Sequence, residues 1–181
     1  MSRLRVYLGC SLDGCIAGPN HDLSFLDEHP PEPDAQGGLS FEDFLSGIGV
    51  LLMGRRTYQV LLDYDVWPYG DRIVLVATHH ELPSAPQGGQ ARAVCGPIDE
   101  LVAEAKALAG GRDVYLDGGD LVRQGLDAAL VDEICLTFLP LVLGRGIRLW
   151  DGLARRNDLV FDPPVMHGRR MVQLRARVAR P

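Results

Sequence analysis

The sequence predicts an α/β domain in three layers, with a mostly parallel central sheet between two layers of helices. Between residues 50 and 139, short apolar runs typical of buried strands alternate with segments of helical periodicity, which is the pattern of a parallel sheet covered on both faces. Two of these runs lead into glycine-bearing turns followed by helices. After residue 140 the pattern changes to two adjoining strands, which predicts an antiparallel hairpin at the C-terminus.

Composition limits the possible classes of protein. The 181 residues fit a single domain, 1–181, large enough to bury its own core. The net charge of −6 argues against a nucleic-acid or acidic-membrane partner. No apolar run approaches the roughly 18 residues of a membrane span, and the N-terminus lacks a signal segment, so we expect a cytoplasmic protein.

Cysteine and histidine usage predicts neither a disulfide framework nor a metal site. The pair His79-His80 has no partner at ligand spacing, so we expect no metal there. The scattered cysteines, which we expect to be free thiols, are Cys10, Cys15, Cys95 and Cys135.

The first fifty residues predict a strand, a long loop and a short helix. The run Leu4–Cys10 predicts a strand, and Asp13-Gly14 predicts a tight turn after it. The segment Gly18–Ser40 contains four prolines and little periodicity, so we expect a loop of the kind that forms lids or binding sites. Apolar residues then recur at helical spacing behind Ser40, a candidate N-cap; they are Phe41, Phe44, Leu45 and Ile48.

The first glycine turn carries positive charge. The run Val50–Met53 predicts a buried strand that leads through Gly54 into a helix beginning near Arg55 and Arg56. Arginine matches phosphate oxygens in geometry and charge, and Thr57 adds a hydroxyl donor. Solvated arginines are the alternative. Positive charge at a helix N-terminus opposes the helix dipole unless an anion binds there, which favours the anion site.

The second glycine turn lies within DVYLDGGDLVRQGL, residues 113–126. A buried strand ends at Asp117, and a helix pattern begins at Asp120. Between them, Gly118 and Gly119 have no β-carbon, so a ligand can approach the backbone closely. The N-terminus of the following helix makes this turn a candidate anion site. The alternative is that the glycines form only a tight connection.

The remaining elements continue the alternation. Pro97 and Gly110 bound a clear amphipathic helix. The other predicted strands are Ile73–Ala77, Ala93–Cys95, Glu133–Leu139, Leu159–His167 and Met171–Val178, the last two joined by a hairpin turn at residues 167–169.

The two glycine turns together predict a ligand with more than one phosphate, most simply a dinucleotide. Both follow parallel strands, and open α/β sheets bind ligands at the carboxyl ends of such strands. The G-x-G-x-x-G fingerprint is absent, which disfavours an ordinary Rossmann site. The G-x-x-x-x-G-K-[ST] loop of nucleotide hydrolases is absent as well.

Five motifs in order resemble the dihydrofolate reductase-like superfamily. They are SLDGCIAG, LLMGRRTY, RIVLVAT, YLDGGDLV and DEICLTFLPLVLGRG, and the resemblance runs from about Arg5 to Val178. The chain is most similar to the branch that contains the reductase domain of the riboflavin-biosynthesis deaminase/reductase and its stand-alone relatives. The zinc-deaminase motifs are absent, so only the reductase half is represented.

The resemblance implies a dihydrofolate reductase-like fold, an NADPH cofactor and hydride transfer to a C=O or C=N carbon of a small-molecule substrate. It also implies a homodimer. The residues that match cofactor-binding positions are Gly9, Ile16, Ala17, Gly54, Arg55, Arg56, Thr57, Thr78, Gly118, Gly119, Asp120, Leu121 and Val122. By position, residues 54–57 would grip the 2′-phosphate and pyrophosphate, residues 118–122 would form the second pyrophosphate loop, and Thr78 would lie near the adenosine ribose. Gly9, Ile16 and Ala17 would form the nicotinamide wall.

The proton donor stays open at the level of sequence. The relevant helix offers Glu42 and Asp43, but alignment on Phe44 puts the acidic position of folate reductases near Ser40. Thr137 is a further candidate because it can order a water. The first loops offer Asp13, Asp22 and Asp27.

Reduction at an open-chain ribose carbon needs no pterin-binding acid, so we expect a reductase of the riboflavin-biosynthesis type, resembling 5-amino-6-(5-phosphoribosylamino)uracil reductase. The alternatives are dihydrofolate reduction, NADPH binding without turnover, and a structural module in which the glycine turns bind nothing.

Overall fold

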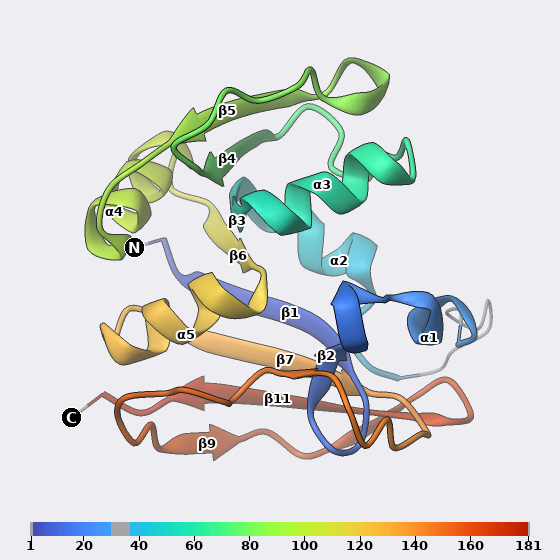
Figure 1. The fold of residues 1–181 in the computed structure, drawn as a ribbon. Coiled ribbons are helices and arrows are strands. Elements are labelled where there is room, and N and C mark those ends of the chain that lie inside the picture. Colours follow the sequence, from blue (N-terminus) through green and yellow to red (C-terminus); the bar gives the residue numbers. More distant parts are fainter. Residues whose placement is uncertain (1, 30–36, 181) are drawn as a thin grey trace.

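The computed structural model describes residues 2–29 and 37–180, and Figure 1 shows a twisted sheet with helices on both faces. The strands are β1 Leu4–Cys10, β2 Cys15–Ala17, β3 Ile48–Gly54, β4 Ile73–Ala77, β5 Gln90–Val94, β6 Asp113–Asp117, β7 Glu133–Phe138, β8 Ile147–Arg148, β9 Leu159–Phe161, β10 Val165–His167 and β11 Met171–Val178. The α-helices are α1 Ser24–Asp27, α2 Phe41–Ser46, α3 Arg55–Asp63, α4 Ile98–Leu108 and α5 Gly119–Asp127, and 3₁₀ turns cover Pro19–His21 and Pro86–Gly88.

The main sheet has nine strands in the described chain, in the order β10-β11-β7-β1-β6-β3-β4-β5, with β9 also paired to β11. Strands β7, β1, β6, β3, β4 and β5 run parallel. Strand β11 pairs antiparallel with β7 and closes that edge. The mostly parallel sheet with an antiparallel C-terminal hairpin, predicted from the sequence, is therefore confirmed.

The sheet separates two hydrophobic cores because successive strand residues point to opposite faces. In β3, Val50 and Leu52 pack with α4 and α5, whereas Leu51 and Met53 pack with α2 and α3. Helix α4 lies so close to the sheet that a β-carbon on Gly49 would come within 2.4 Å of the Ala109 carbonyl oxygen. These two cores form the predicted three-layer arrangement.

Several predicted boundaries were wrong. The segment Leu159–His167 is two strands rather than one, because Pro163 and Pro164 have no amide proton to donate to a sheet. Ile48 begins β3 instead of continuing the helix before it. Strand β5 begins three residues earlier than expected and ends before Cys95. Strand β7 ends before Leu139.

Other expectations about the chain had mixed outcomes. The small antiparallel sheet of β2 and β8 was not predicted. The long loop expected at Gly18–Ser40 contains a 3₁₀ turn and α1, and its residues 30–36 lie outside the described residues. All four cysteines are free thiols, as expected. Within the described ranges, no helix has the length and apolar character of a membrane span.

A buried ion pair joins β1 to β7 near their amino ends. Arg5 and Glu133 are 8% and 7% exposed, and Arg5 Nε and Nη2 both donate to Glu133 Oε1, at 2.9 and 2.5 Å. The guanidinium also lies 4.9 Å from the centre of the Phe44 ring. Losing one partner of such a pair leaves a buried charge uncompensated.

We expect Glu133→Gln to lower the free energy of unfolding by up to about 3–5 kcal/mol, because the buried Arg5 would lose its close ion pair and keep only the longer contact with Asp113 Oδ2, at 3.5 Å. Urea denaturation monitored by circular dichroism measures the change. The control is Asp158→Asn, since the Arg156–Asp158 pair is 86% and 63% exposed and contributes at most about 1 kcal/mol. Equal effects of the two variants would contradict this account.

Candidate functional site

The site is built on two neighbouring parallel strands, β3 and β6. Their register pairs Met53 with Asp117, so both strands end at the same edge of the sheet. Gly54 is the N-cap of α3 and Gly118 the N-cap of α5, and neither supplies a side-chain cap to its helix. The N-terminal amides of both helices therefore face the same region with no side-chain acceptor from their caps.

The two turns touch each other, and glycine is required at their contact. A β-carbon on Gly118 would come within 2.7 Å of Thr57 Oγ1, and its φ of +93° is unfavourable for other residues. A β-carbon on Gly119 would come within 2.5 Å of Ile16 Cδ1 and 3.3 Å of Arg123 Nη1. Side chains at either position would fill the space in front of the helix termini.

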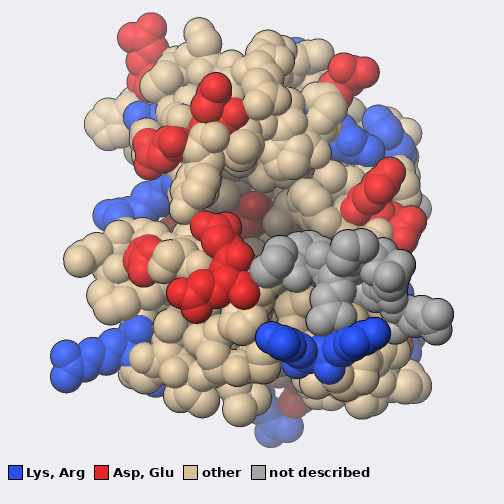
Figure 2. Space-filling view, turned by 90° about the vertical axis from the view of Figure 1, so that its right-hand side faces the viewer, with Lys and Arg blue, Asp and Glu red and all other residues tan. Residues whose placement is uncertain are grey.

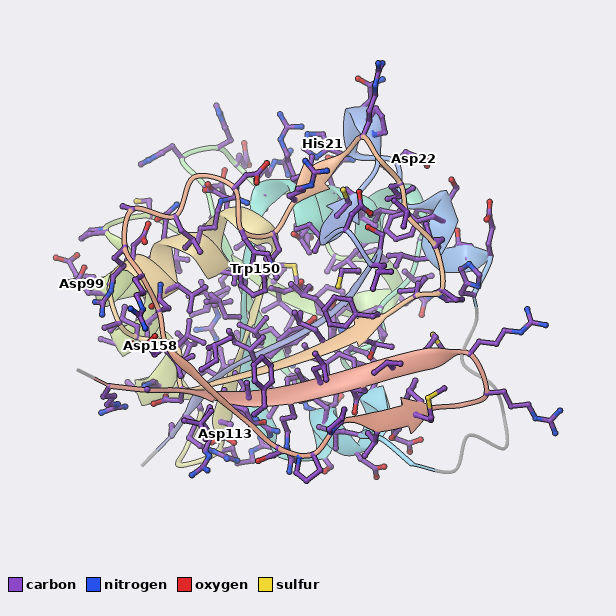
Figure 3. All side chains as sticks on the ribbon, turned by 90° about the horizontal axis from the view of Figure 1, so that it is seen from below. His21, Asp22, Asp99, Asp113, Trp150 and Asp158 are labelled. Carbon is purple, nitrogen blue, oxygen red and sulfur yellow. The ribbon has the colours of Figure 1, made fainter. Side chains whose placement is uncertain are left out.

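Positive charge gathers at the start of α3. The first turn of this helix contains Arg55 and Arg56 and no acidic residue. Arg55 Nη1 is buried and has no hydrogen-bond partner in the described chain. Arg56 Nη1 contacts Nε2 of His21, a residue of the first loop. In Figure 3, His21 lies on the opposite side of the molecule from Asp113, which begins β6. An anion is the natural partner for this group of donors.

A first cavity of about 890 Å³ contains both turns. It is lined by every residue predicted to bind cofactor except Val122, namely Gly9, Ile16, Ala17, Gly54, Arg55, Arg56, Thr57, Thr78, Gly118, Gly119, Asp120 and Leu121. The Val122 side chain is fully buried in the core, and its amide donates to the Gly118 carbonyl. Helical periodicity turns that side chain away from the cavity.

A second cavity of about 410 Å³ adjoins the first. Tyr7, Gly9, Leu26 and Phe41 line both. The other residues that line the second cavity are His29, Gly37, Gly38, Ser40, Asp43, Thr137, Leu139, His167 and Met171. Gly9, at the carboxyl end of β1, therefore stands at the junction of the two cavities.

Hydrogen bonds join Tyr7 and Thr137, which line the second cavity, to Leu39 and Gln173. Gln173 Nε2 donates to Thr137 Oγ1 at 3.1 Å, and Gln173 Oε1 accepts the Leu39 amide at 2.6 Å. Tyr7 donates its hydroxyl proton to the Leu39 carbonyl at 2.8 Å, and burial raises the pKa of Tyr7 to about 12. The Thr137 hydroxyl also interacts with the Tyr7 hydroxyl and partly offsets this rise in pKa.

The structure separates the candidate proton donors. Asp43 and Thr137 line the second cavity, whereas Glu42 lines neither cavity. Asp43 Oδ2 accepts a hydrogen bond from the hydroxyl of Ser40, the N-cap of α2, at 2.7 Å. Both residues line the second cavity, with the carboxyl group of Asp43 beside the hydroxyl of Ser40.

The acids of the first loops lie outside both cavities. The Asp13 carboxylate accepts the Ser11 hydroxyl and the Leu143 and Gly144 amides at 2.7 to 3.0 Å. These hydrogen bonds, with that from Ser11 the largest effect, hold the pKa of Asp13 below its usual value. Asp22 accepts from Ser24. Neither Asp22 nor Asp27 lines either cavity, so the structure does not bring these carboxylates to the site.

Sequence reasoning missed two buried polar residues of the cavities. Asp117 lines the first cavity, and burial raises the pKa of its carboxyl to about 6, although the Gly118 amide donates to it at 2.7 Å. Its position between a buried strand and a Gly-Gly turn was an available signal. His167 lines the second cavity, and its Nδ1 is buried without a partner in the described chain. No local pattern identified His167, which the C-terminal hairpin brings to the site.

Comparison with known proteins agrees with this architecture. A protein from Shewanella sp. PV-4 that is named for riboflavin biosynthesis has a TM-score of 0.84 at 27% identity, covering 98% of this chain and 99% of that one. The diaminohydroxyphosphoribosylaminopyrimidine deaminase/5-amino-6-(5-phosphoribosylamino)uracil reductase of Thermotoga maritima has a TM-score of 0.68 at 13% identity, covering 98% of this chain and 57% of that one. The predicted fold class is therefore confirmed.

Sequence comparisons point to the same family. The uncharacterized protein YwjB of Bacillus subtilis (strain 168) is 28% identical over 155 residues, which are 85% of this chain and 86% of YwjB. The model of the RibD C-terminal domain matches residues 3–174. The resemblance read from the five motifs is confirmed, and the chain belongs to the RibD C-terminal domain family.

Proposed function

We propose that this protein is an NADPH-dependent reductase that acts on a small metabolite. Members of the RibD C-terminal domain family are reductases. The observation that carries the cofactor assignment is the meeting of two uncapped helix N-termini and the buried, unpartnered Arg55 Nη1 in one cavity. Such an arrangement suits a diphosphate, with Arg55 and Arg56 near a further phosphate.

The residues present fit the cofactor. At the start of α5, a β-carbon on Gly118 or Gly119 would collide with Thr57 or Ile16, so glycine keeps the approach to this helix terminus open. The cavity of about 890 Å³ has these turns between its two ends: Thr78 lines it on the β4 side, and Gly9 of β1, with Ile16 and Ala17, lines it on the other. The volume of the cavity and its charged, polar and apolar lining residues suit a long ligand that carries phosphates in one part and a flat ring in another.

The protein's own contribution to the reaction is orientation, electrostatics and exclusion of water. NADPH, when bound, supplies a hydride equivalent to a polarised C=O or C=N carbon. Gly9 lies where both cavities meet, so a substrate in the second cavity would face the nicotinamide wall. Thr137 offers a hydroxyl proton there, and Asp43 is the carboxyl that lines the same cavity. We propose that one of them orders the water or proton that reaches the substrate heteroatom.

An absorbance assay separates the candidate functions. The purified protein is incubated with NADPH and a riboflavin-pathway intermediate, with dihydrofolate, or with buffer. Oxidation with the pyrimidine intermediate supports the riboflavin-type reaction, and oxidation with dihydrofolate supports folate reduction. Cofactor binding without oxidation would favour a binding protein, and no binding would contradict the proposal.

We further propose that residues 1–181 act as one cytoplasmic domain that pairs as a homodimer through the C-terminal strands. Several apolar side chains on this edge of the sheet are exposed. Single exposed apolar residues are common on protein surfaces, whereas a group of them marks an interface. The group consists of Val160, Phe161, Val165, Met166 and Val172, with exposures of 37% to 58%.

We expect Arg55→Ala to weaken NADPH binding by about tenfold or more and NADH binding by much less, because a hydrogen bond to a charged group contributes about 1.5–3 kcal/mol. Fluorescence titration with both cofactors measures the difference. Arg112→Ala, at an exposed arginine outside both cavities, is the control. Equal losses for the two cofactors would show that Arg55 does not contact the 2′-phosphate.

We expect Gly119→Val to abolish cofactor binding while the protein stays folded, because the new side chain would occupy the space beside Ile16 in front of α5. Calorimetry measures binding, and thermal unfolding verifies the fold. Ala128→Val, at the exposed C-terminal end of the same helix, is the matched control. An unchanged dissociation constant in Gly119→Val would contradict the proposed location of the diphosphate.

We expect NADPH to bind about tenfold more tightly at about pH 5 than at about pH 7.5, the effect of one unit of pKa coupling. Asp117, whose pKa burial raises to about 6, is ionised at the higher pH and repels the anionic cofactor. Protonation removes that charge, so affinity rises as pH falls through about 6. Asp117→Asn should lose this increase and keep only the change that comes from the 2′-phosphate of the cofactor, whose second pKa is about 6. A pH profile that Asp117→Asn leaves unchanged would assign the titration to another group.

A further inference from the structure

We propose that the substrate of this protein is a nitrogen heterocycle without a phosphate group, bound in the second cavity. The proposal rests on the reductase function above and specifies its substrate class. It departs from the reaction named for the Thermotoga maritima protein, whose pyrimidine carries a 5-phosphoribosyl group. The described residues that line the second cavity suit a flat ring. They include no lysine or arginine, the side chains that a phosphate requires.

The fixed positive charges of the connected cavities are confined to the first. Arg55, Arg56 and Arg123 line the first cavity, whereas the described residues that line the second include no lysine or arginine. Residues 30–36, which are not described, read PPEPDAQ and contain no lysine or arginine either. The described lining of the second cavity therefore contains no permanent cation.

The carboxyl group of the second cavity works against an anionic ligand. Asp43 lines this cavity. Figure 2 shows that acidic side chains also lie around a central hollow on one face of the molecule. Arg169 and Arg170 of the hairpin turn are exposed and do not line the cavity. Moving a phosphate dianion from water to such a place would cost several kcal/mol without a paired cation.

The same cavity is well suited to a flat, uncharged ring. Tyr7 and Phe41 form an aromatic wall with their ring centres 5.6 Å apart, and aromatic faces bind planar rings by stacking. The apolar lining is completed by Leu26, Leu139 and Met171. A volume of about 410 Å³ accommodates a pyrimidine or pteridine with a short polar side chain.

Polar groups are positioned to recognise the ring edge. Thr137 lines the cavity, and the hydrogen bond from Gln173 Nε2 fixes the position of its hydroxyl group. His167 is 9% exposed, and its Nδ1 has no partner in the described chain. A β-carbon on Gly38 would come within 2.6 Å of this nitrogen, so glycine there leaves it uncovered by a side chain. Neutral donors and acceptors of this kind match the amide and amino groups of a heterocycle.

Calorimetry with matched ligand pairs tests the proposal. Each pair is a pyrimidine or pteridine riboside-type compound and its phosphate monoester, including 5-amino-6-ribosylaminouracil and its 5′-phosphate. Binding is measured to the NADPH-saturated protein at about pH 8, where the phosphate monoesters are dianions. We expect the compound without phosphate to bind at least about tenfold more tightly in the best pair. Tighter or equal binding of the phosphate monoesters, or no binding by any pair, would overturn the proposal.

Variants of the second cavity give an independent measurement. Asp43→Arg should reverse the preference within the best pair by supplying the missing cation, and a preference that stays unchanged would contradict the electrostatic argument. His167→Phe should weaken the unphosphorylated ligand about tenfold, His167→Gln should recover part of that loss, and His80→Phe, at an exposed histidine outside both cavities, should have no effect. NADPH affinity is recorded for every variant. If the unmodified protein does not bind NADPH, the reductase function is rejected, and the ligand preference is then measured on the cofactor-free protein.

Discussion

The site depends on the parallel pairing of β3 with β6. Pairing of Met53 with Asp117 fixes where both strands end, and each is followed within two residues by a helix. The contact between Gly118 and Thr57 is a consequence of that register. A shift of the strands along one another would separate the helix termini, so that they could no longer face one ligand together.

Charged residues behave differently at the two ends of the parallel strands. At the amino ends, Arg3 pairs with Asp113 at 2.7 Å and Arg5 pairs with Glu133, so these charges join strands. At the carboxyl ends, Arg55 Nη1 has no partner in the described chain, and burial raises the pKa of Asp117. The amino ends thus use paired charges for stability, and the carboxyl ends keep groups whose interactions a ligand can complete.

Local sequence patterns predicted the features that depend on neighbouring residues. Alternation of apolar runs with helical segments predicted the layers, and glycines after strands predicted the two turns. Patterns failed where distant segments meet. His167 reaches the second cavity because β10 pairs with β11 and β11 with β7. The same pairing of β11 with β7 brings Gln173 to Thr137, which is more than thirty residues away in the sequence. Val122 matches a cofactor-binding position of the family, but its side chain lies in the core, because a motif match does not distinguish a lining side chain from a core one.

The junction at Gly9 connects the charge distribution with the chemistry. A β-carbon there would come within 3.2 Å of Leu26 Cδ2, so a larger residue would narrow the passage that both cavities share. Under the proposed function, the arginines of α3 and the carboxyl of Asp43 would direct an anionic cofactor and an uncharged substrate to opposite sides of this passage. Because the attraction acts only on the phosphates, the cofactor's uncharged ring is the part left to extend toward Gly9, where it would meet the substrate. The same separation of charge that selects the ligands therefore also sets their relative orientation.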